Sequence, residues 1–173
     1  AFGKLFVETE YLPESAALLG HRRPRDSAEP GMWVMHVVSL EGRTQGAVEW
    51  ETDRARFIGR GRSVENPIAL DGRALSGTTG VVLDPILSLR QRVRLPPGAS
   101  VRLCFATGMA ADRDTAAALA QTYRDPRAPS RAFALALALQ HPRLDLLGVT
   151  TVQGDSHTRA LIVCRLLQEI GRA

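Results

Sequence analysis

The chain has 173 residues, 45% of them hydrophobic, and a formal net charge of +4. This length fits one domain with at most a small appendage, and the apolar content excludes an intrinsically disordered chain. The charge comes almost entirely from arginine, because Lys4 is the only lysine. Aromatic residues are few and no recognition helix or RNA-binding motif is present, so we expect no nucleic-acid partner.

The sequence also limits membrane contact and redox chemistry. Its longest apolar run, residues 133–139, is too short to span a bilayer, and no signal peptide opens the chain. We therefore expect a cytoplasmic segment with no membrane contact of its own, and a fragment of something longer because Ala1 follows no methionine. Cys104 and Cys164 are either buried thiols or a bridge.

The first third of the chain predicts short strands joined by polar turns. Alternating or β-branched runs place these strands at residues 4–11, 17–22, 32–40 and 45–51, with a polar loop at 24–31. Glu41-Gly42-Arg43 is predicted to be a tight hairpin turn. Strands at such regular spacing are typical of a β-sandwich.

The stretch 75–110 contains the strongest strand signals. In residues 88–95, Leu89, Gln91, Val93 and Leu95 alternate with a serine and three arginines, which indicates a strand with one wet face. Alternation resumes at residues 99–106, after Pro96-Pro97-Gly98. We predict that these two strands pair as an antiparallel hairpin across this turn. Upstream, Pro85 limits residues 81–85 to an edge or the start of a strand.

Residues 52–70 are rich in arginine and glycine, and they have two interpretations. Arg56, Arg60 and Arg62 surround glycines that let a backbone approach a ligand, and guanidinium groups hydrogen-bond sugar hydroxyls, carboxylates or phosphates. These three arginines are therefore the candidate carbohydrate-binding residues. The alternative is a surface loop whose arginines pair with acidic neighbours, namely Glu49, Glu51, Asp53 and Glu65.

Other residue types suggest structure more than chemistry. The four histidines have no metal-ligand spacing, and no nucleophile elbow or phosphate-binding glycine motif is present. We predict no metal, no cofactor and no catalytic residue in this chain. His36 is interpreted as a core histidine with its hydrogen bonds satisfied. Trp33 and Trp50 are interpreted as core residues rather than as platforms for a sugar ring.

The pattern changes to helix after residue 110. Asp112 is a suitable N-cap for a helix over residues 113–124, which Asp125-Pro126 ends, and Ser130 is predicted to cap a second helix over 131–140. Residues 146–152 then predict an apolar strand that adds to a sandwich edge, pairs with another chain or is poorly ordered. An amphipathic helix follows, with its apolar stripe at Val163, Leu166, Leu167 and Ile170.

Residues 1 to about 134 resemble cyclic β-1,2-glucan synthases. The resemblance is carried by KLFVETEY, HRRPR, WETDRARFIGRGR, LSGTTGVVLDPILSLRQRVRLPPG, FATGMA and SRAFALA. These motifs are similar to the carbohydrate-binding β-sandwich of the family-94 glycoside phosphorylase-like region of those enzymes. The resemblance implies a partial sandwich that supports a catalytic barrel, and it supplies no catalytic residue. It also implies anchoring of the synthase in the inner membrane by segments other than this one.

Residues from about 134 to 173 resemble the N-terminal part of an inosine/uridine nucleoside hydrolase. The resemblance is carried by ALALALQHPRLDLLGVTTVQGDSHTRALIVCRLLQEIGR. It implies that Asp155 matches a ribose-contacting position, although we favour the alternative that Asp155 caps the helix that follows it. The family's Ca²⁺-binding aspartate pair falls here on Ala132 and Phe133, which offer no oxygen ligands from their side chains.

Together these patterns predict an α+β chain that is mainly β with C-terminal helices. We expect a β-sandwich fragment at 1–110, a helical linker containing a fusion junction at 111–141 and a strand–helix fragment at 142–173. The predicted function is a non-catalytic carbohydrate-binding or scaffold fragment fused to a truncated nucleoside-hydrolase segment. The alternative is a nucleoside hydrolase relative that has lost its metal motif. Expected partners are a β-glucan oligosaccharide and a second copy through the unpaired strand.

Overall fold

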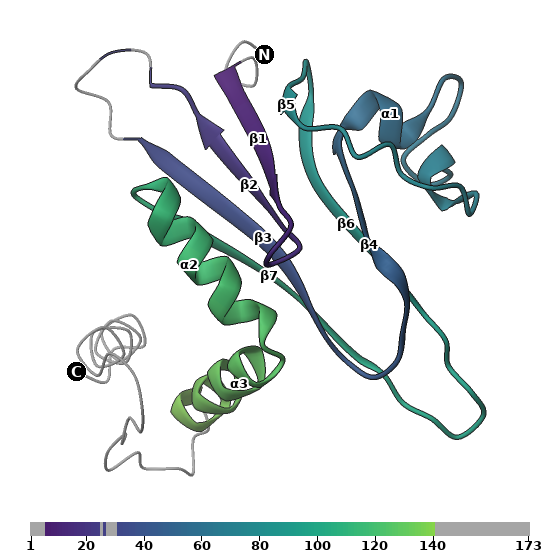
Figure 1. Cartoon of the computed structure of the whole chain (residues 1–173), viewed down its shortest axis with the longest axis vertical. Helices are drawn as coiled ribbons and strands as arrows, with labels where there is room; N and C mark the ends of the chain where they lie inside the picture. The colour runs from purple at the N-terminus through teal and green to yellow at the C-terminus, as the bar shows by residue number, and fades with distance from the viewer. Residues whose placement is uncertain (1–5, 25, 27–30, 141–173) are drawn as a thin grey trace. The chain divides into compact units, whose positions relative to one another are not determined.

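The computed structural model describes residues 6–24, 26 and 31–140. The chain divides into two compact units, residues 1–129 and 130–173, and each is considered by itself. The first unit contains every strand of the described region and the helix α2, as Figure 1 shows. The predicted strand at 146–152, the helix after it and Asp155 lie outside the described residues.

A five-stranded antiparallel sheet forms the centre of the first unit. Its strand order is β5-β1-β2-β3-β7. Three of the strands coincide closely with the runs that the sequence predicts near residues 4–11, 17–22 and 32–40, although the first begins only at Val7 and residues 4 and 5 lie outside the described part. The bounds of the five strands are β1 Val7–Leu12, β2 Ala17–Arg22, β3 Met32–Glu41, β5 Gly80–Val81 and β7 Arg102–Ala110.

A second sheet has two strands, β4 (Thr44–Asp53) and β6 (Pro85–Val93). Pro85 is the first residue of β6, where a residue without a backbone N–H is tolerated. β3 and β4 follow one another across Gly42 and Arg43 but belong to different sheets, and so do β6 and β7. The segment that contains β3 and β4 therefore runs antiparallel to the segment that contains β6 and β7, and both segments bend as they pass from one sheet into the other (Figure 1).

The bend at Gly42 corrects the predicted hairpin turn at residues 41–43. Instead of pairing β3 with β4, this tripeptide leads the chain from one sheet into the other. Gly42 has φ +139°, and a Cβ atom there would lie 2.9 Å from Cγ2 of Val101. Glycine is needed at this corner because other residues are strained at such a φ and because the facing strand comes too close.

The predicted pairing of residues 88–95 with 99–106 is wrong. A turn does form at the expected place, with the Ala99 N–H donating to the Pro96 carbonyl and Gly98 at φ +74°. The strands on either side then diverge: β6 pairs with β4, whereas β7 pairs with β3 over nine consecutive residue pairs. Alternation reports which face of a strand is buried but says nothing about its partner, so turn residues alone suggested the wrong one.

The helix α2 (Arg113–Arg124) covers one face of the five-stranded sheet. Asp112 caps it as predicted, accepting a hydrogen bond of 2.8 Å from the Thr115 N–H. Ala116 and Ala120 are fully buried, and their small size lets the helix approach the sheet closely. The core of this layer consists of these two alanines with Leu12, Ala17, Leu19, Met35 and Val37.

The opposite face of the same sheet packs on the two-stranded sheet. Leu18 and Val38 project from the larger sheet and meet Leu89 of β6, so successive residues of β2 belong to two different cores. Tyr11 and Trp50 close this second core, with their rings stacked 3.5 Å apart. The predicted fold class is confirmed: the chain is mainly antiparallel β with helices near its C-terminal part, in a sandwich-like α+β arrangement.

The two helices after residue 110 are also confirmed, with α3 (Arg127–Gln140) separated from α2 at Asp125-Pro126. However, α3 begins four residues before the predicted position, so Ser130 lies inside it. Asp125 provides the capping contact instead, because its carboxylate accepts a hydrogen bond of 2.9 Å from the Arg127 N–H. Pro129 is tolerated because the first turn of a helix does not use its backbone N–H groups.

Candidate functional site

The arginine-rich segment forms a compact loop between β4 and the residues that lead to β5. It begins with the short helix α1 (Arg54–Ile58), for which Asp53 is the N-cap and accepts from the Ala55 N–H at 2.9 Å. Gly59 ends this helix at φ +86° and donates to the Ala55 carbonyl oxygen. A 3₁₀ turn, η2 (Ile68–Leu70), then returns the chain toward the two-stranded sheet.

Gly59 also determines how closely the two halves of the loop pack. A Cβ atom at this position would lie 2.9 Å from both Cβ and Cγ2 of Ile68. The glycine is therefore explained by a helix end and by packing within the loop. At Gly61, by contrast, which has φ +71°, no atom lies within 4 Å of the position that a Cβ would take.

The three candidate arginines differ in what they contact. Arg62 donates two parallel hydrogen bonds to Asp71, of 2.6 and 3.1 Å, and a third of 3.2 Å to Asn66. Arg56 has a long ion pair with Asp53, at 3.7 Å. Arg60 is exposed and forms no side-chain hydrogen bond or ion pair within the part of the chain that the structure describes. Of the three, Arg60 is the one whose donors have no acceptor among the residues that the structure describes.

The acidic partners are only in part those named by the surface-loop interpretation. Asp53 does pair with Arg56, as that interpretation expects. Arg62 pairs instead with Asp71, and Arg54 pairs with Asp84. Glu49 contacts two arginines of β6, at 2.5 Å from Arg90 and 3.1 Å from Arg92. The alternation in residues 88–95 predicted an arginine-bearing face of a strand. It could not predict that β4, which carries Glu49, would be the neighbouring strand.

Arg90 and Arg92 fasten the loop to the two-stranded sheet. Arg90 donates to the carbonyl oxygens of Ala69 and Arg73, and Arg92 donates to that of Gly72 at 2.7 Å. Glu49 adds a further tie, because its carboxylate accepts from the Leu75 N–H at 2.8 Å. Charge-assisted hydrogen bonds therefore hold residues 69–75, the part of the loop that follows Arg60 and Arg62, against the two-stranded sheet.

These contacts predict an acid-sensitive stability. The Leu75 N–H and the guanidinium groups of Arg90 and Arg92 lower the pKa of Glu49 from 4.5 to about 2. Above pH 4.5 its stabilising effect is complete; as the pH falls toward 2, the unfolded chain binds a proton that the folded chain does not, and stability is lost. We expect Glu49→Gln to remove roughly 2 kcal/mol of the pH-dependent change.

The measurement is chemical unfolding at pH values from 2 to 6. The variant Glu41→Gln is a matched control, because Glu41 also pairs with an arginine across two strands but is half exposed. The wild type and this control should lose stability in parallel between pH 4.5 and 2. A Glu49→Gln variant with the full wild-type slope would show that this carboxylate carries little of the effect.

A second polar network is centred on the buried carboxylate of Glu51. Glu51, only 1% exposed, accepts hydrogen bonds from the N–H groups of Thr52 and Asp53 and from the Ser76 hydroxyl. Burial raises the pKa of Glu51, but the hydrogen bonds from Ser76, Asp53, Thr78 and Thr52 outweigh it and the net pKa is lowered. This network ties residues 76–78 to β4 and is structural in character.

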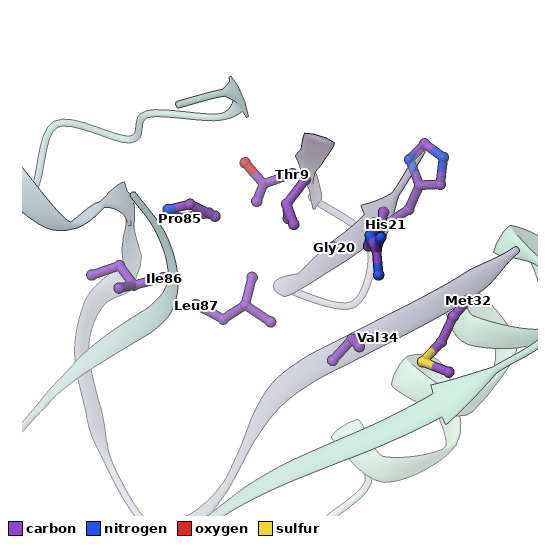
Figure 2. A pocket seen from close by; sticks show the side chains of 10 residues that line it. Thr9, Gly20, His21, Met32, Val34, Pro85, Ile86 and Leu87 are labelled. Carbon is purple, nitrogen blue, oxygen red and sulfur yellow. The ribbon is translucent and has the colours of Figure 1, made fainter. Parts of the chain in front are cut away.

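A pocket of about 380 Å³ opens between the two sheets, and no residue of the arginine loop lines it. Figure 2 shows Val34, Ile86 and Leu87 along its walls and the ring of His21 turned away from it. The Thr9 hydroxyl is already engaged, 3.0 Å from Thr52 Oγ1 and 3.1 Å from the Gly80 carbonyl oxygen. Such a lining suits apolar groups and lacks the convergent polar groups that a sugar requires.

The remaining candidate residues lie in structural positions. Trp33 stacks on His21 with ring centroids 4.5 Å apart and packs beside the helix-side core, as Trp50 does in the other core. His36 is half buried, 2.8 Å from the Thr107 hydroxyl, and burial lowers its pKa. Within residues 6–24, 26 and 31–140, no three metal-binding side chains gather and no helix has the length and apolarity for a bilayer.

Comparison with known proteins assigns most of the chain to one kind of domain. Residues 1–126 match the family described as "Glycosyl hydrolase 94, supersandwich domain". The chain is 33% identical over 156 residues to the cyclic beta-(1,2)-glucan synthase NdvB of Rhizobium meliloti (strain 1021). That match covers 90% of this chain but only 6% of the synthase. Because it omits only a tenth of the chain, the likeness continues past residue 134, where the sequence suggested a junction.

Proposed function

Because the chain belongs to the glycosyl hydrolase 94 supersandwich family, we propose that it is a carbohydrate-binding or scaffolding part of a cyclic β-1,2-glucan synthase-like protein and is not itself catalytic. The observation that carries the proposal is the family match over residues 1–126 together with the partial antiparallel sandwich. A cytoplasmic location of this segment remains a prediction.

The arginine loop is the proposed sugar contact. Arg60 supports this role because it is exposed, has guanidinium donors without a partner among the described residues, and lies between two glycines of positive φ. Arg56 could add donors, since its contact with Asp53 is long and its side chain is 61% exposed. Arg62 has a different place in the proposal: its paired hydrogen bonds to Asp71 shape the loop, and a sugar would have to compete with that carboxylate.

The proposal predicts weak glucan binding that depends on Arg60. We expect Arg60→Ala to weaken binding of a β-1,2-glucan oligosaccharide about tenfold, because hydrogen bonds from a charged donor are lost. Titration calorimetry or NMR shift perturbation on the full chain measures this. Arg94→Ala is the matched control, since Arg94 is also exposed but lies between β6 and β7.

Two outcomes separate the parts of the proposal. Equal loss of binding in Arg60→Ala and Arg94→Ala would indicate nonspecific attraction by positive charge, against the loop as a site. Complete absence of glucan binding by the wild type would leave the scaffold role alone. Arg62→Ala should lower thermal stability as well as binding, because it releases Asp71 and Asn66.

The non-catalytic part of the proposal has its own test. Phosphorolysis of a glycan needs a carboxylic acid at the glycosidic oxygen and a phosphate pocket, and nucleoside hydrolysis in the resembled family needs Ca²⁺. We therefore expect no turnover by purified chain with phosphate and a β-1,2-glucan, or with Ca²⁺ and inosine or uridine. Nucleoside turnover abolished by Asp155→Ala would instead establish the nucleoside hydrolase alternative.

A further inference from the structure

The pocket of about 380 Å³ between the two sheets has a regular construction. Its floor is one face of the five-stranded sheet, where alternate residues of three neighbouring strands point the same way. The floor consists of two rows of cross-strand neighbours, namely Val7, Arg22 and Met32 in one row and Thr9, Gly20 and Val34 in the next. Residues 85–87 of β6 form the facing wall, and Figure 2 shows the Leu87 side chain pointing toward the larger sheet.

This pocket, called here the inter-sheet pocket, has a closed end and an open end. Leu18 lies two residues before Gly20 on the same face of β2, and it is fully buried in the core between the sheets. At the other end β1 begins, β2 ends with Arg22 and β3 begins with Met32, which is 50% exposed. A ligand therefore enters at the strand ends, and its inner part reaches Gly20.

Gly20 keeps the inner part of the pocket open. A Cβ atom there would lie 3.7 Å from Cδ2 of Leu87, an ordinary contact distance, and its φ is outside the left-handed range. Neither a turn nor a close approach requires this glycine, although glycine weakens a strand interior and often marks the approach of a ligand. Its effect is to leave space between Thr9 and Val34, its neighbours on the two adjoining strands.

Polarity is divided between the two ends. The inner part is aliphatic, and the Thr9 hydroxyl there is already bonded to Thr52 and to the Gly80 carbonyl oxygen. Among the described residues that line the pocket, Arg22 is the one with a formal charge at neutral pH, and it belongs to the outer row. An aliphatic interior with a guanidinium group toward its mouth is complementary to an apolar chain that ends in an anion.

We propose that the inter-sheet pocket binds a single-chain aliphatic carboxylate, a fatty acid of medium length. Its chain lies along Gly20, Val34 and Leu87, and its carboxylate lies at Arg22. The volume is near the lower limit of small-molecule pockets, roughly 300–1,000 Å³, which favours one chain over a two-chain lipid. Because no residue of the arginine loop lines this pocket, the inference is independent of the proposed glucan contact.

The first experiment titrates the full chain by calorimetry with three probes of equal chain length, namely decanoate, decanol and decylamine. Decanoate should bind one molecule per chain, and decanol at least about tenfold more weakly, because it lacks the charged hydrogen bond. Decylamine should bind most weakly, since its charge has the same sign as that of Arg22. This series tests the head group in the wild type, so its result does not depend on the folding of any variant.

The second experiment closes the pocket. Gly20→Val should weaken decanoate binding at least about tenfold, because its branched side chain suits a strand and occupies the space of the ligand chain. Ala47→Val is the matched control, since it adds two methyl groups at an exposed position of β4. Far-UV circular dichroism and thermal unfolding verify that both variants keep their fold.

The charged end has its own pair of variants. Arg22→Gln should weaken decanoate binding about tenfold and leave decanol binding unchanged. The matched control is Arg23→Gln, because Arg23 is 66% exposed, pairs with Glu8 and does not line the pocket. No binding of decanoate by the wild type, equal binding of decanoate and decanol, or wild-type affinity in Gly20→Val would each overturn the proposal.

Discussion

Replacing Leu18 by alanine is expected to lower the free energy of unfolding by about 2–5 kcal/mol, the range for a large aliphatic residue removed from a core. Leu18 is fully buried between the two sheets, where it meets Val38 and Leu89. Only a few other side chains pack in this core, so they cannot fill the cavity that removal of the Leu18 side chain would leave. Denaturant unfolding followed by tryptophan fluorescence measures the change, since Trp50 borders this core.

Leu83→Ala is the control for Leu18→Ala, because Leu83 is 82% exposed. It should change stability by less than about 0.5 kcal/mol. Leu19→Ala provides a second comparison: its side chain is equally buried but packs in the helix-side core. Similar large losses at Leu18 and Leu19 would show that both layers fold as one unit, whereas a negligible loss at Leu18 would contradict the inter-sheet core.

Replacing Glu51 by alanine is expected to cost about 2–4 kcal/mol, because a buried charged acceptor is lost and the buried N–H of Thr52 is left without it. The N–H groups of Thr52 and Asp53 and the hydroxyl of Ser76 all depend on this carboxylate. Their loss should also loosen residues 76–78, which the same network holds against β4. Hydrogen exchange at Thr52 and Asp53, measured beside thermal unfolding, reports both effects.

Two variants make the Glu51 prediction specific. Glu14→Ala removes an exposed carboxylate near a strand turn and should have little effect on stability. Ser76→Ala removes one of the four donors, so it should cost less than Glu51→Ala and leave the two backbone contacts and the Thr78 hydroxyl in place. If Ser76→Ala cost as much as Glu51→Ala, the hydroxyl contact would carry the network and the backbone donors would contribute little.

Local features of the fold could be predicted where neighbouring residues decide the structure. Asp112 before a helical run indicated the start of α2, and Asp125-Pro126 indicated its end, because caps and proline act within one turn. The strand β2 was predicted with its observed bounds, Ala17–Arg22. By contrast, Ser130 was given a capping role that Asp125 holds, since several polar residues near a helix start compete for it.

The candidate site was predictable only as a set of residue types. Glycines and arginines marked residues 52–70 as a loop that could contact a ligand. The sequence could not tell that Arg62 is engaged by Asp71 while Arg60 is free of partners among the described residues. This difference depends on the position of Asp71, which follows η2. Arg90 and Arg92 fix that position, because they donate to the carbonyl oxygens of Ala69 and Gly72 on either side of Asp71.

The sequence by itself determined where most of the strands and the helices α2 and α3 lie and to which family the chain is similar, because periodicity, turn residues and long motifs are local properties. It did not determine which face of β7 is buried, since Leu103, Phe105 and Met109 are exposed. Only the tertiary structure decided which strands pair. β7 joins β3 and β6 joins β4, although Pro96-Pro97-Gly98 connects β6 directly to β7. The physical reason is that backbone hydrogen bonds are alike in every strand, so partners are chosen by the burial of Leu18, Val38 and Leu89 and by the pairing of Glu49 with Arg90.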